Sequence, residues 1–321
     1  MKSLLIYSLS LATALVLTAC QSIKTNTTPH PAQHLRPAEQ QSLIEREQQQ
    51  HQQPIIAVVL GSGGARGYAH IGVLEALEQH GIQPNFIVGT SAGSIAGVVY
   101  AATKDAQALK QIAKTMKIAD VRAFDIGLQG VFDGQKIEDY INQQVNYQPL
   151  ENLEIPVYVV ATQLDNGRRV VFNYGNAGQA VRASVTIPTM FAPVKIGEHE
   201  YVDGGLVSPV PVHVAKELGA DLVIAVNILA VPHYTDTGNL WGLFNQNINI
   251  MQNQLANEEM KYADIVIQPD IREKAHIFDV KSRDVSIQAG FDAALAQMPS
   301  IQQKLQQLQQ ERKQHQATQA K

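Results

Sequence analysis

Short apolar runs alternate with stretches of helical periodicity between residues 54 and 300, and this alternation limits the possible folds more than any other feature of the chain. Residues 55–60 are apolar throughout, which is typical of a strand buried on both faces. Apolar residues then recur at helical spacing, at Ile71, Leu74 and Leu77. Strands that alternate with helices favour a mostly parallel sheet covered on both faces. We therefore predict a three-layer α/β fold.

The remaining elements follow from the same patterns. Runs rich in β-branched residues predict further strands at 86–89, 157–164, 169–172, 222–228 and 264–268. Helices are expected at 94–103, 105–117, 178–186, 211–218 and within 240–262. Because 45% of the 321 residues are hydrophobic and only 17% are charged, the chain can bury a large core, and disorder of its bulk is excluded.

The first twenty residues predict export and lipidation. Lys2 precedes an apolar run from Leu4 to Leu17, which is too short to span a bilayer comfortably, and small residues precede Cys20. This pattern resembles a bacterial lipoprotein signal, which implies removal of residues 1–19 and acylation of Cys20. An ordinary secretory signal, in which Cys20 is incidental, is the alternative.

Gln21, rather than aspartate, follows that cysteine. By resemblance to lipoprotein sorting in double-membraned bacteria, this favours the periplasmic face of the outer membrane. The expected location is therefore the bacterial cell envelope, where buried acyl chains hold the protein to the membrane.

Two segments outside the predicted domain are rich in glutamine. Residues 20–53 are polar and contain three prolines, a composition that buries too little apolar surface to offset its ordering entropy. We expect a flexible tether there. Residues 301–321 are also Gln-rich, but Leu305 and Leu308 are at helical spacing, so a helical or disordered tail is expected.

The sharpest local motif is a G-x-S-x-G formed by Gly89-Thr90-Ser91-Ala92-Gly93, between an expected strand and an expected helix. Glycines on both sides of the serine allow the strained turn that exposes a nucleophilic hydroxyl. A tight turn with an incidental serine would have the same spacing, but the strand-turn-helix context favours a nucleophile. Ser91 is therefore the candidate nucleophile.

A second glycine-rich segment, residues 61–67, follows the first expected strand and begins a helix. Glycines let backbone N–H groups converge on an oxyanion, and the helix N-terminus adds roughly half a positive charge. The rival interpretation is a dinucleotide-binding G-x-G-x-x-G, which Gly61 and Gly63 match. Arg66 occupies its third glycine position, so nucleotide binding is disfavoured.

The third segment is Asp203-Gly204-Gly205, directly after Tyr201-Val202. An aspartate before two glycines is often a turn residue that bonds to nearby backbone. Taken alone, the triplet indicates only a turn.

Together the three segments resemble the patatin-like phospholipase family, in particular its bacterial branch. The resemblance covers most of residues 54–300, which are expected to form a patatin-like catalytic domain. It also rests on Arg182-Ala183-Ser184, Ile187-Pro188, Phe191 and residues 217–221.

The resemblance implies roles for individual residues. By matching positions, Ser91 would be the nucleophile and Asp203 its base. Gly63 and Gly64 would form the oxyanion hole, with Arg66 beside them. The other motif glycines are Gly61, Gly67, Gly89, Gly93, Gly204 and Gly205, the last of which stands where many relatives have alanine.

The activity implied by the resemblance is hydrolysis of carboxylic esters of lipids, of phospholipase A or lysophospholipase type, through an acyl-Ser91 intermediate. An ordinary aspartate, with a pKa of about 3.9, is a weak base for this task, and burial would raise that pKa. One alternative is a Ser-His-Asp esterase whose base is His213, His233 or His276. Another is a catalytically silent envelope lipoprotein that binds lipid or a partner.

Charge and cysteine content restrict the partners. A net charge of -4 argues against a nucleic-acid binder, which would be strongly basic. A single cysteine excludes a disulfide framework and a Cys-rich zinc site. No cluster of His or carboxylates has metal-ligand spacing, so we expect neither a metal nor a cofactor. The expected partners are a lipid ester and, through Cys20, a membrane surface.

Two apolar groups have open roles. Leu240, Trp241, Leu243 and Phe244 are interpreted as the buried side of a helix, with an acyl-chain lid or a membrane-insertion patch as the alternative. Met190 and Phe191 either line an acyl pocket or pack in the core.

Overall fold

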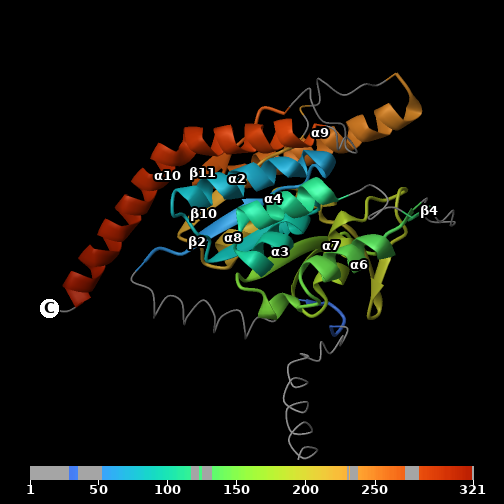
Figure 1. Cartoon of the computed structure of the whole chain (residues 1–321), viewed down its shortest axis with the longest axis horizontal. Helices are drawn as coiled ribbons and strands as arrows, with labels where there is room; N and C mark the ends of the chain where they lie inside the picture. The colour runs from blue at the N-terminus through green and yellow to red at the C-terminus, as the bar shows by residue number, and fades with distance from the viewer. Residues whose placement is uncertain are drawn as a thin grey trace, which may run out of the picture.

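A nine-stranded sheet forms the centre of the molecule (Figure 1). The computed structural model describes residues 29–34, 53–116, 123–124, 132–229, 231, 238–271 and 282–319. Parallel pairing joins, in this order, β6 (Val157–Gln163), β3 (Phe86–Thr90), β2 (Ile56–Leu60), β10 (Leu222–Val226) and β11 (Ile265–Ile267). Antiparallel strands extend the sheet from β6, namely β7 (Arg169–Tyr174), β1 (Gln33–His34), β9 (His199–Asp203) and β8 (Val194–Ile196).

Helices cover both faces of the sheet, which confirms the predicted three-layer α/β architecture. On one face the core includes residues of α2 (Tyr68–Gln79), α3 (Ala92–Thr103), α4 (Ala106–Thr115), α6 (Gln135–Gln144), α7 (Ala177–Val185) and α10 (Arg283–Gln319). On the other face it includes α8 (Val212–Glu217) and part of α9 (Leu240–Met260). The two layers are therefore unequal in size.

The central strands are apolar throughout because each is buried on both faces. Val58 and Leu60 of β2 belong to the larger core, whereas Ala57 and Val59 belong to the smaller one. Side chains alternate across a strand, so a strand between two helical layers needs apolar residues at every position. The strand predicted at 55–60 is confirmed for this reason.

Several short elements were not predicted. The hairpin of β8 and β9 reverses direction around Gly197, whose φ is +61°. Helix α6 has few apolar positions, of which Ile137 and Ile141 are buried. Short elements η1 (Gly64–Gly67), η2 (Leu150–Asn152) and η3 (Gly204–Leu206), and the two-residue pair β4 (Ala123–Phe124) and β5 (Phe132–Asp133), complete the described chain.

Part of the predicted tether is in fact attached to the sheet. Strand β1 pairs with β7, and the His34 ring packs edge-on against Phe172 with a centroid distance of 5.4 Å. Ala32 is buried, and its N–H donates to Gln179 Oε1 at 2.8 Å. The expectation of a free tether is wrong for residues 29–34, because the apolar contacts come from distant strands rather than from the segment itself.

The C-terminal segment continues a folded helix. Helix α10 runs along α2, passes residue 300 without a break and ends at Gln319, and its last turns project beyond the body (Figure 1). Leu305 and Leu308 pack against the larger core, and Arg312 pairs with Asp221. The segment is helical, and residue 300 does not mark the end of a structural element.

The predicted signal and lipidation site lie in a part of the chain that the structure does not describe. Residues 1–19 and Cys20 fall outside the described residues. Within the described ranges, none of the helices combines the length and apolar character needed to cross a membrane.

Candidate active site

Ser91 occupies a strained turn between β3 and α3. Its φ of 54° and ψ of -120° lie in a region that residues other than glycine rarely adopt, at a cost of about 1–3 kcal/mol. The Ser91 N–H donates to Ser184 Oγ at 2.8 Å, and the Ser184 hydroxyl donates to the Val160 carbonyl at 2.6 Å. Helix α7 and strand β6 therefore hold the turn in place.

The glycines of the three motifs permit close approaches between backbone segments. A Cβ on Gly93 would lie 1.9 Å from the Leu60 carbonyl oxygen, and one on Gly204 would lie 2.3 Å from the Val160 oxygen. A Cβ would also be closer than 3.0 Å to a neighbouring atom at Gly61, Gly67, Gly89 and Gly205. These positions let the strand ends, the start of α3 and η3 pack tightly around Ser91.

Asp203 ends β9 and contacts Ser91, although 112 positions separate them. The Ser91 hydroxyl donates to Asp203 Oδ2 at 2.7 Å, and the Gly205 N–H donates to Oδ1 at 2.7 Å. The backbone of Asp203 is fixed by hydrogen bonds with Thr186 and Thr162. One carboxylate oxygen thus serves the turn that the triplet predicts, and the other faces the candidate nucleophile.

Burial alters the acidity of this carboxyl. Loss of solvent raises the pKa of Asp203 to about 6, although the hydrogen bonds from Gly205 and Ser91 favour the ionised form and act in the opposite direction. The Asp203 side chain is therefore ionised at neutral pH, yet more basic than an ordinary aspartate. Both properties suit a group that must accept a proton from a hydroxyl.

We expect the kcat/KM of ester hydrolysis to rise with pH through an inflection near 6 and to level off above it. A general base must be unprotonated, so the role that the resemblance implies for Asp203 predicts a loss of activity as this residue binds a proton below its pKa. Fatty-acid release measured between about pH 4 and pH 9 gives the profile. A profile that is flat across this range, or one that falls as the pH rises through 6, would exclude Asp203 as the base.

The glycine-rich loop lies beside this pair. The Ser62 N–H donates to the Pro209 carbonyl at 2.8 Å, and the Gly61 N–H donates to the Val226 carbonyl at 3.1 Å. Gly64 has a φ of +59°, in the left-handed region that favours glycine, and lines the same cavity as Ser91. Within the described chain, the N–H groups of Gly63 and Gly64 have no hydrogen-bond partner. They are thus available to an oxyanion.

The resemblance implies a place for Arg66 beside the oxyanion hole, and the Arg66 N–H donates to the Gly63 carbonyl at 3.3 Å. Its buried side chain donates from Nε to the Ile228 carbonyl at 2.9 Å. The guanidinium therefore ties η1 to the segment after β10, which is a structural role. The motif places Arg66 in the correct loop, but the spacing of residues does not give the direction of its side chain.

His70 is a residue of this region that sequence reasoning missed. It is fully buried in α2, and its Nε2 lies 2.8 Å from the Gly61 carbonyl, to which it donates. Burial lowers the pKa of His70 to about 4, so the ring is neutral at pH 7. His70 holds the start of the glycine-rich loop, and its position in the first turn of the following helix is the only signal in the sequence.

The histidines proposed as alternative bases receive no support. His213 lies on α8 and packs against the Tyr262 ring at a centroid distance of 4.5 Å, whereas His233 and His276 fall outside the described residues. The Ser91 hydroxyl donates to Asp203 itself, so the geometry needs no histidine between them. In the part of the chain that the structure describes, no group of three or more His, Cys, Asp or Glu is placed to hold a metal ion.

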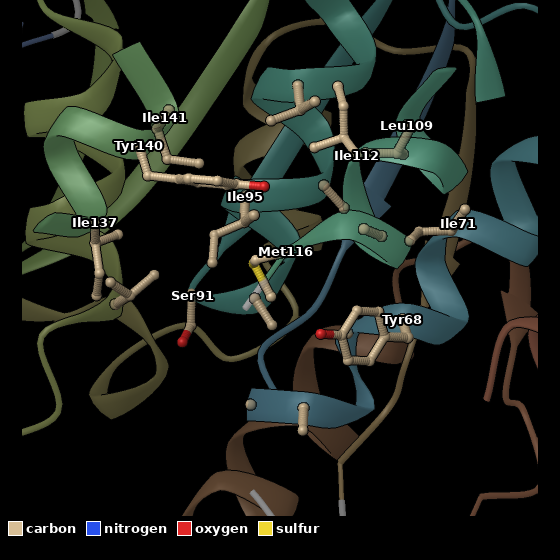
Figure 2. A pocket seen from close by; sticks show the side chains of 18 of the residues that line it. Tyr68, Ile71, Ser91, Ile95, Leu109, Ile112, Met116, Ile137, Tyr140 and Ile141 are labelled. Carbon is tan, nitrogen blue, oxygen red and sulfur yellow. The ribbon is translucent and has the colours of Figure 1, made fainter. Parts of the chain in front are cut away.

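An apolar cavity of about 230 Å³ adjoins Ser91 (Figure 2). Helices α2, α3, α4 and α6 and residues 185–191 form its wall. The wall includes Ile71, Ile95, Leu109, Ile112, Met116 and Ile137. Phe191 lines the cavity, as one of its two interpretations predicted, whereas Met190 is buried in the core. The arrangement can accept an apolar chain next to an activated hydroxyl.

Part of the chain is similar to known proteins. Residues 58–216 match the family model described as Patatin-like phospholipase. An uncharacterised NTE family protein of Mycobacterium tuberculosis is 37% identical over 177 residues, which cover 54% of this chain and 49% of that protein. The Lysophospholipase NTE1 of Coccidioides immitis is 32% identical over 205 residues, which cover 60% of this chain and 13% of that protein. The chain thus spans about half the length of the mycobacterial relative.

A solved structure shares the fold at low sequence identity. The crystal structure of VipD from Legionella pneumophila superposes with a TM-score of 0.52 and 14% identity, covering 78% of this chain and 67% of that one. At this identity the likeness concerns the fold alone.

Proposed function

We propose, from the match of residues 58–216 to the Patatin-like phospholipase family model, that this protein is a serine lipid acyl hydrolase that cleaves carboxylic esters of lipids. One observation carries the proposal: the Ser91 hydroxyl donates to a buried carboxylate at 2.7 Å, on the wall of an apolar cavity. A serine hydroxyl is a poor nucleophile until a neighbouring base accepts its proton. The hydrogen bond from Ser91 supports Asp203 as that base.

The proposed reaction has two steps. Asp203 accepts the hydroxyl proton as Ser91 attacks the ester carbonyl, and this proton then passes to the departing alcohol as the acyl-Ser91 forms. Water, deprotonated by the same carboxylate, attacks the acyl-enzyme; Asp203 then returns this proton to the Ser91 oxygen as the acyl–Ser91 bond breaks and the fatty acid leaves. The raised pKa of Asp203 makes acceptance of a proton, from Ser91 or from water, more favourable than it would be with an ordinary aspartate.

The negative charge that develops on the carbonyl oxygen requires donors already in position. We assign this role to the N–H groups of Gly63 and Gly64, at the start of η1. The turn is closed by the Arg66 N–H, which donates to the Gly63 carbonyl at 3.3 Å. Loss of one such donor typically costs about 2.7–4 kcal/mol of transition-state stabilisation. Gly61 packs tightly against the Val226 carbonyl, and this contact helps to hold the start of the loop in position.

The cavity indicates which part of the substrate enters. Its wall is almost entirely aliphatic and aromatic, and Ile95 and Met116 lie near Ser91 while Leu109 and Ile71 lie further away (Figure 2). An acyl chain fits such a wall, whereas a charged head group would lose its hydration there. One relative carries the name lysophospholipase, so we propose a fatty acyl ester of phospholipid or lysophospholipid type as the substrate.

Hydrolysis of p-nitrophenyl esters from butyryl to palmitoyl tests this proposal. We expect kcat/KM to rise with acyl length, because longer chains bury more apolar surface in the cavity. Ala113 lines the cavity, so Ala113→Phe fills part of the space for the acyl chain. The variant is expected to lower turnover of the palmitoyl ester by about tenfold or more, with little effect on the butyryl ester. Gln111→Phe, at an exposed position of the same helix, is the matched control.

Two outcomes would count against the proposal. Folded protein that cleaves no acyl ester would favour the catalytically silent lipoprotein. A preference for the butyryl ester that Ala113→Phe leaves unchanged would show that the cavity does not hold the acyl chain.

The envelope location remains a proposal based on sequence. We propose that Cys20 is acylated after removal of residues 1–19 and holds the protein at the periplasmic face of the outer membrane. This location would place the site near its lipid substrates.

A further inference from the structure

Helix α9 presents an unusual amount of apolar surface to solvent. Leu243, Ile250, Met251 and Leu255 expose 50%, 45%, 61% and 36% of their surfaces, and Tyr262, just after the helix, exposes 56%. Among the described residues, these are five of the nine exposed large hydrophobic side chains, so the apolar surface is concentrated here. Leu243 had been interpreted as a core residue, and its exposure contradicts that interpretation.

The exposed residues share one side of α9. Leu243 and Ile250 are seven positions apart, and Met251 and Leu255 four, so all four fall within one broad face of the helix. The opposite face carries Ala256, which is completely buried, and Glu259, at the border between the two faces, is 6% exposed. The outward apolar face is therefore not a consequence of poor packing, because the inward face of the same helix is well buried.

Most of the same helix lacks charge. Residues 238–257 contain no Asp, Glu, Lys or Arg, although 17% of the chain is charged and roughly three such residues would be expected in this length. Asparagine and glutamine supply the polar positions instead. Directly after this segment, Glu258 and Lys261 pair with each other at 2.6 Å. A helix face that is exposed to water normally carries charged side chains, so the composition of this face is not typical of one in contact with water.

The inward face of α9 is bonded to the loops of the active site. Glu259 accepts hydrogen bonds from Ser208 Oγ at 2.5 Å and from the Val210 N–H at 3.1 Å. The Ser208 carbonyl in turn accepts from Thr90 Oγ1 at 2.9 Å, next to Ser91. A Cβ on Gly205 would lie 2.5 Å from Gln252 Nε2, so α9 also covers the turn after Asp203. The exposed face is thus one helix diameter from the catalytic loops.

From these observations we infer that the outward face of α9, formed by Leu243, Ile250, Met251 and Leu255, rests on the surface of a lipid bilayer. The inference depends on the proposed function, because a lipid ester must reach Ser91 from a lipid aggregate. A bilayer of zwitterionic lipid has no net charge for a partner to complement, and its interface accepts both apolar side chains and the amides of asparagine and glutamine. The uncharged amphipathic part of α9 matches that surface, whereas a partner recognised through ion pairs would require charges that residues 238–257 lack.

The contact is one of surface binding. No helix among the described residues is apolar enough over its length to cross a membrane, and α9 is fixed to the body along its inward face. Because apolar burial rather than charge attraction supplies the affinity, binding is expected to be insensitive to salt and to require no anionic lipid.

Vesicle co-sedimentation tests the inference. The full chain carrying Cys20→Ser, which removes the candidate lipid anchor, is mixed with phosphatidylcholine vesicles at low and at high salt. We expect Leu243→Asn, Ile250→Asn and Met251→Gln together to lower the partition coefficient by about tenfold or more. The matched control replaces Leu164, Val285 and Leu295, which are exposed to 44%, 49% and 36%, with glutamine and is expected to bind as the parent does.

The remaining outcomes separate this inference from its rivals. Equal vesicle binding by both triple variants, or binding that requires anionic lipid and disappears at high salt, would overturn it. A loss of self-association in the α9 variant, seen by sedimentation velocity without any change in vesicle binding, would assign the face to a second copy of the chain. Hydrolysis of soluble p-nitrophenyl butyrate should be the same in all variants. Vesicle binding by a protein that cleaves no ester would refute the proposed function and leave the surface assignment intact.

Discussion

Ser91→Ala is expected to lower the kcat/KM of ester hydrolysis by roughly 10⁴-fold or more, which in practice is the background rate without enzyme, while the protein remains folded. The substitution removes the only group that the proposed reaction uses to form the acyl-enzyme. Alanine tolerates the backbone of residue 91 no worse than serine does, because both carry a Cβ at a φ of 54°. Fatty-acid release by purified protein, with thermal unfolding as the test of folding, measures both effects.

Ser94→Ala provides the matched control for this prediction. Ser94 is also buried in the first turn of α3, but its hydroxyl donates to the Ser91 carbonyl at 2.7 Å and not to Asp203. We expect Ser94→Ala to retain activity within about tenfold of the parent. If Ser91→Ala retained as much activity as Ser94→Ala, a different nucleophile would have to be found.

Asp203→Asn is expected to have two opposite effects, a loss of activity and a gain of stability at neutral pH. Activity should fall by about 10⁴-fold, because the amide keeps the shape of the side chain but does not accept a proton. The stability effect follows from the pKa of Asp203, which is 3.8 for the free side chain and about 6 in the folded protein. The folded state binds a proton more readily, so the contribution of Asp203 to stability is greatest below pH 3.8 and is lost as the pH rises through 6.

This shift corresponds to about 3 kcal/mol of lost stability above pH 6, at 1.36 kcal/mol for each pKa unit. Asparagine carries no charge, so the variant should unfold at higher denaturant concentration than the parent at pH 8, and the difference should disappear near pH 4. Denaturant unfolding of both proteins at the two pH values measures this. A variant that is less stable than the parent at pH 8 would mean that hydrogen bonds to the carboxylate outweigh its desolvation. A mere weakening of activity, combined with complete loss in a single His→Ala variant, would favour the Ser-His-Asp alternative.

Asp203 and Ser91 both lower the stability of the folded protein. A neutral side chain at position 203 would suit the buried turn better than a carboxylate does, since desolvation raises the pKa of Asp203 by more than its hydrogen bonds lower it. The strained backbone of Ser91 is a second local cost. Both costs fall on the two residues that the proposed reaction needs. This is the expected pattern when a site is arranged for chemistry at the expense of stability.

The sequence predicted the parallel part of the fold well and its edges poorly. Buried central strands such as 55–60 are recognisable because both faces demand apolar residues, and their positions are confirmed. Strand β1 offers no such signal, because its two residues pair with β7 and receive their apolar contacts from Phe172 and Tyr201. The hairpin of β8 and β9 is short and half-exposed, and α6 has too few apolar positions to reveal helical periodicity.

The candidate site shows a similar division. Three motifs, and the family resemblance they carry, predicted that Ser91 and Asp203 act together, and the structure places their oxygens at hydrogen-bond distance. The side chain of Arg66 and the loop contact of His70 were not predictable, because both depend on which backbone carbonyl lies opposite them in three dimensions. Of the cavity wall, only Phe191 had been given as one of two interpretations; the rest was not predictable, since four helices that are separate in the sequence contribute to it.

The central claim is that Ser91 becomes covalently acylated when Asp203 accepts its proton. Its most direct test is reaction of the folded protein with a fluorophosphonate at neutral pH, followed by mass spectrometry of the intact chain and of its peptides. The account predicts one adduct per chain, located on Ser91, formed much more slowly in Asp203→Asn and absent from Ser91→Ala. No adduct on the folded protein, or an adduct on another residue that persists in Ser91→Ala, would contradict it.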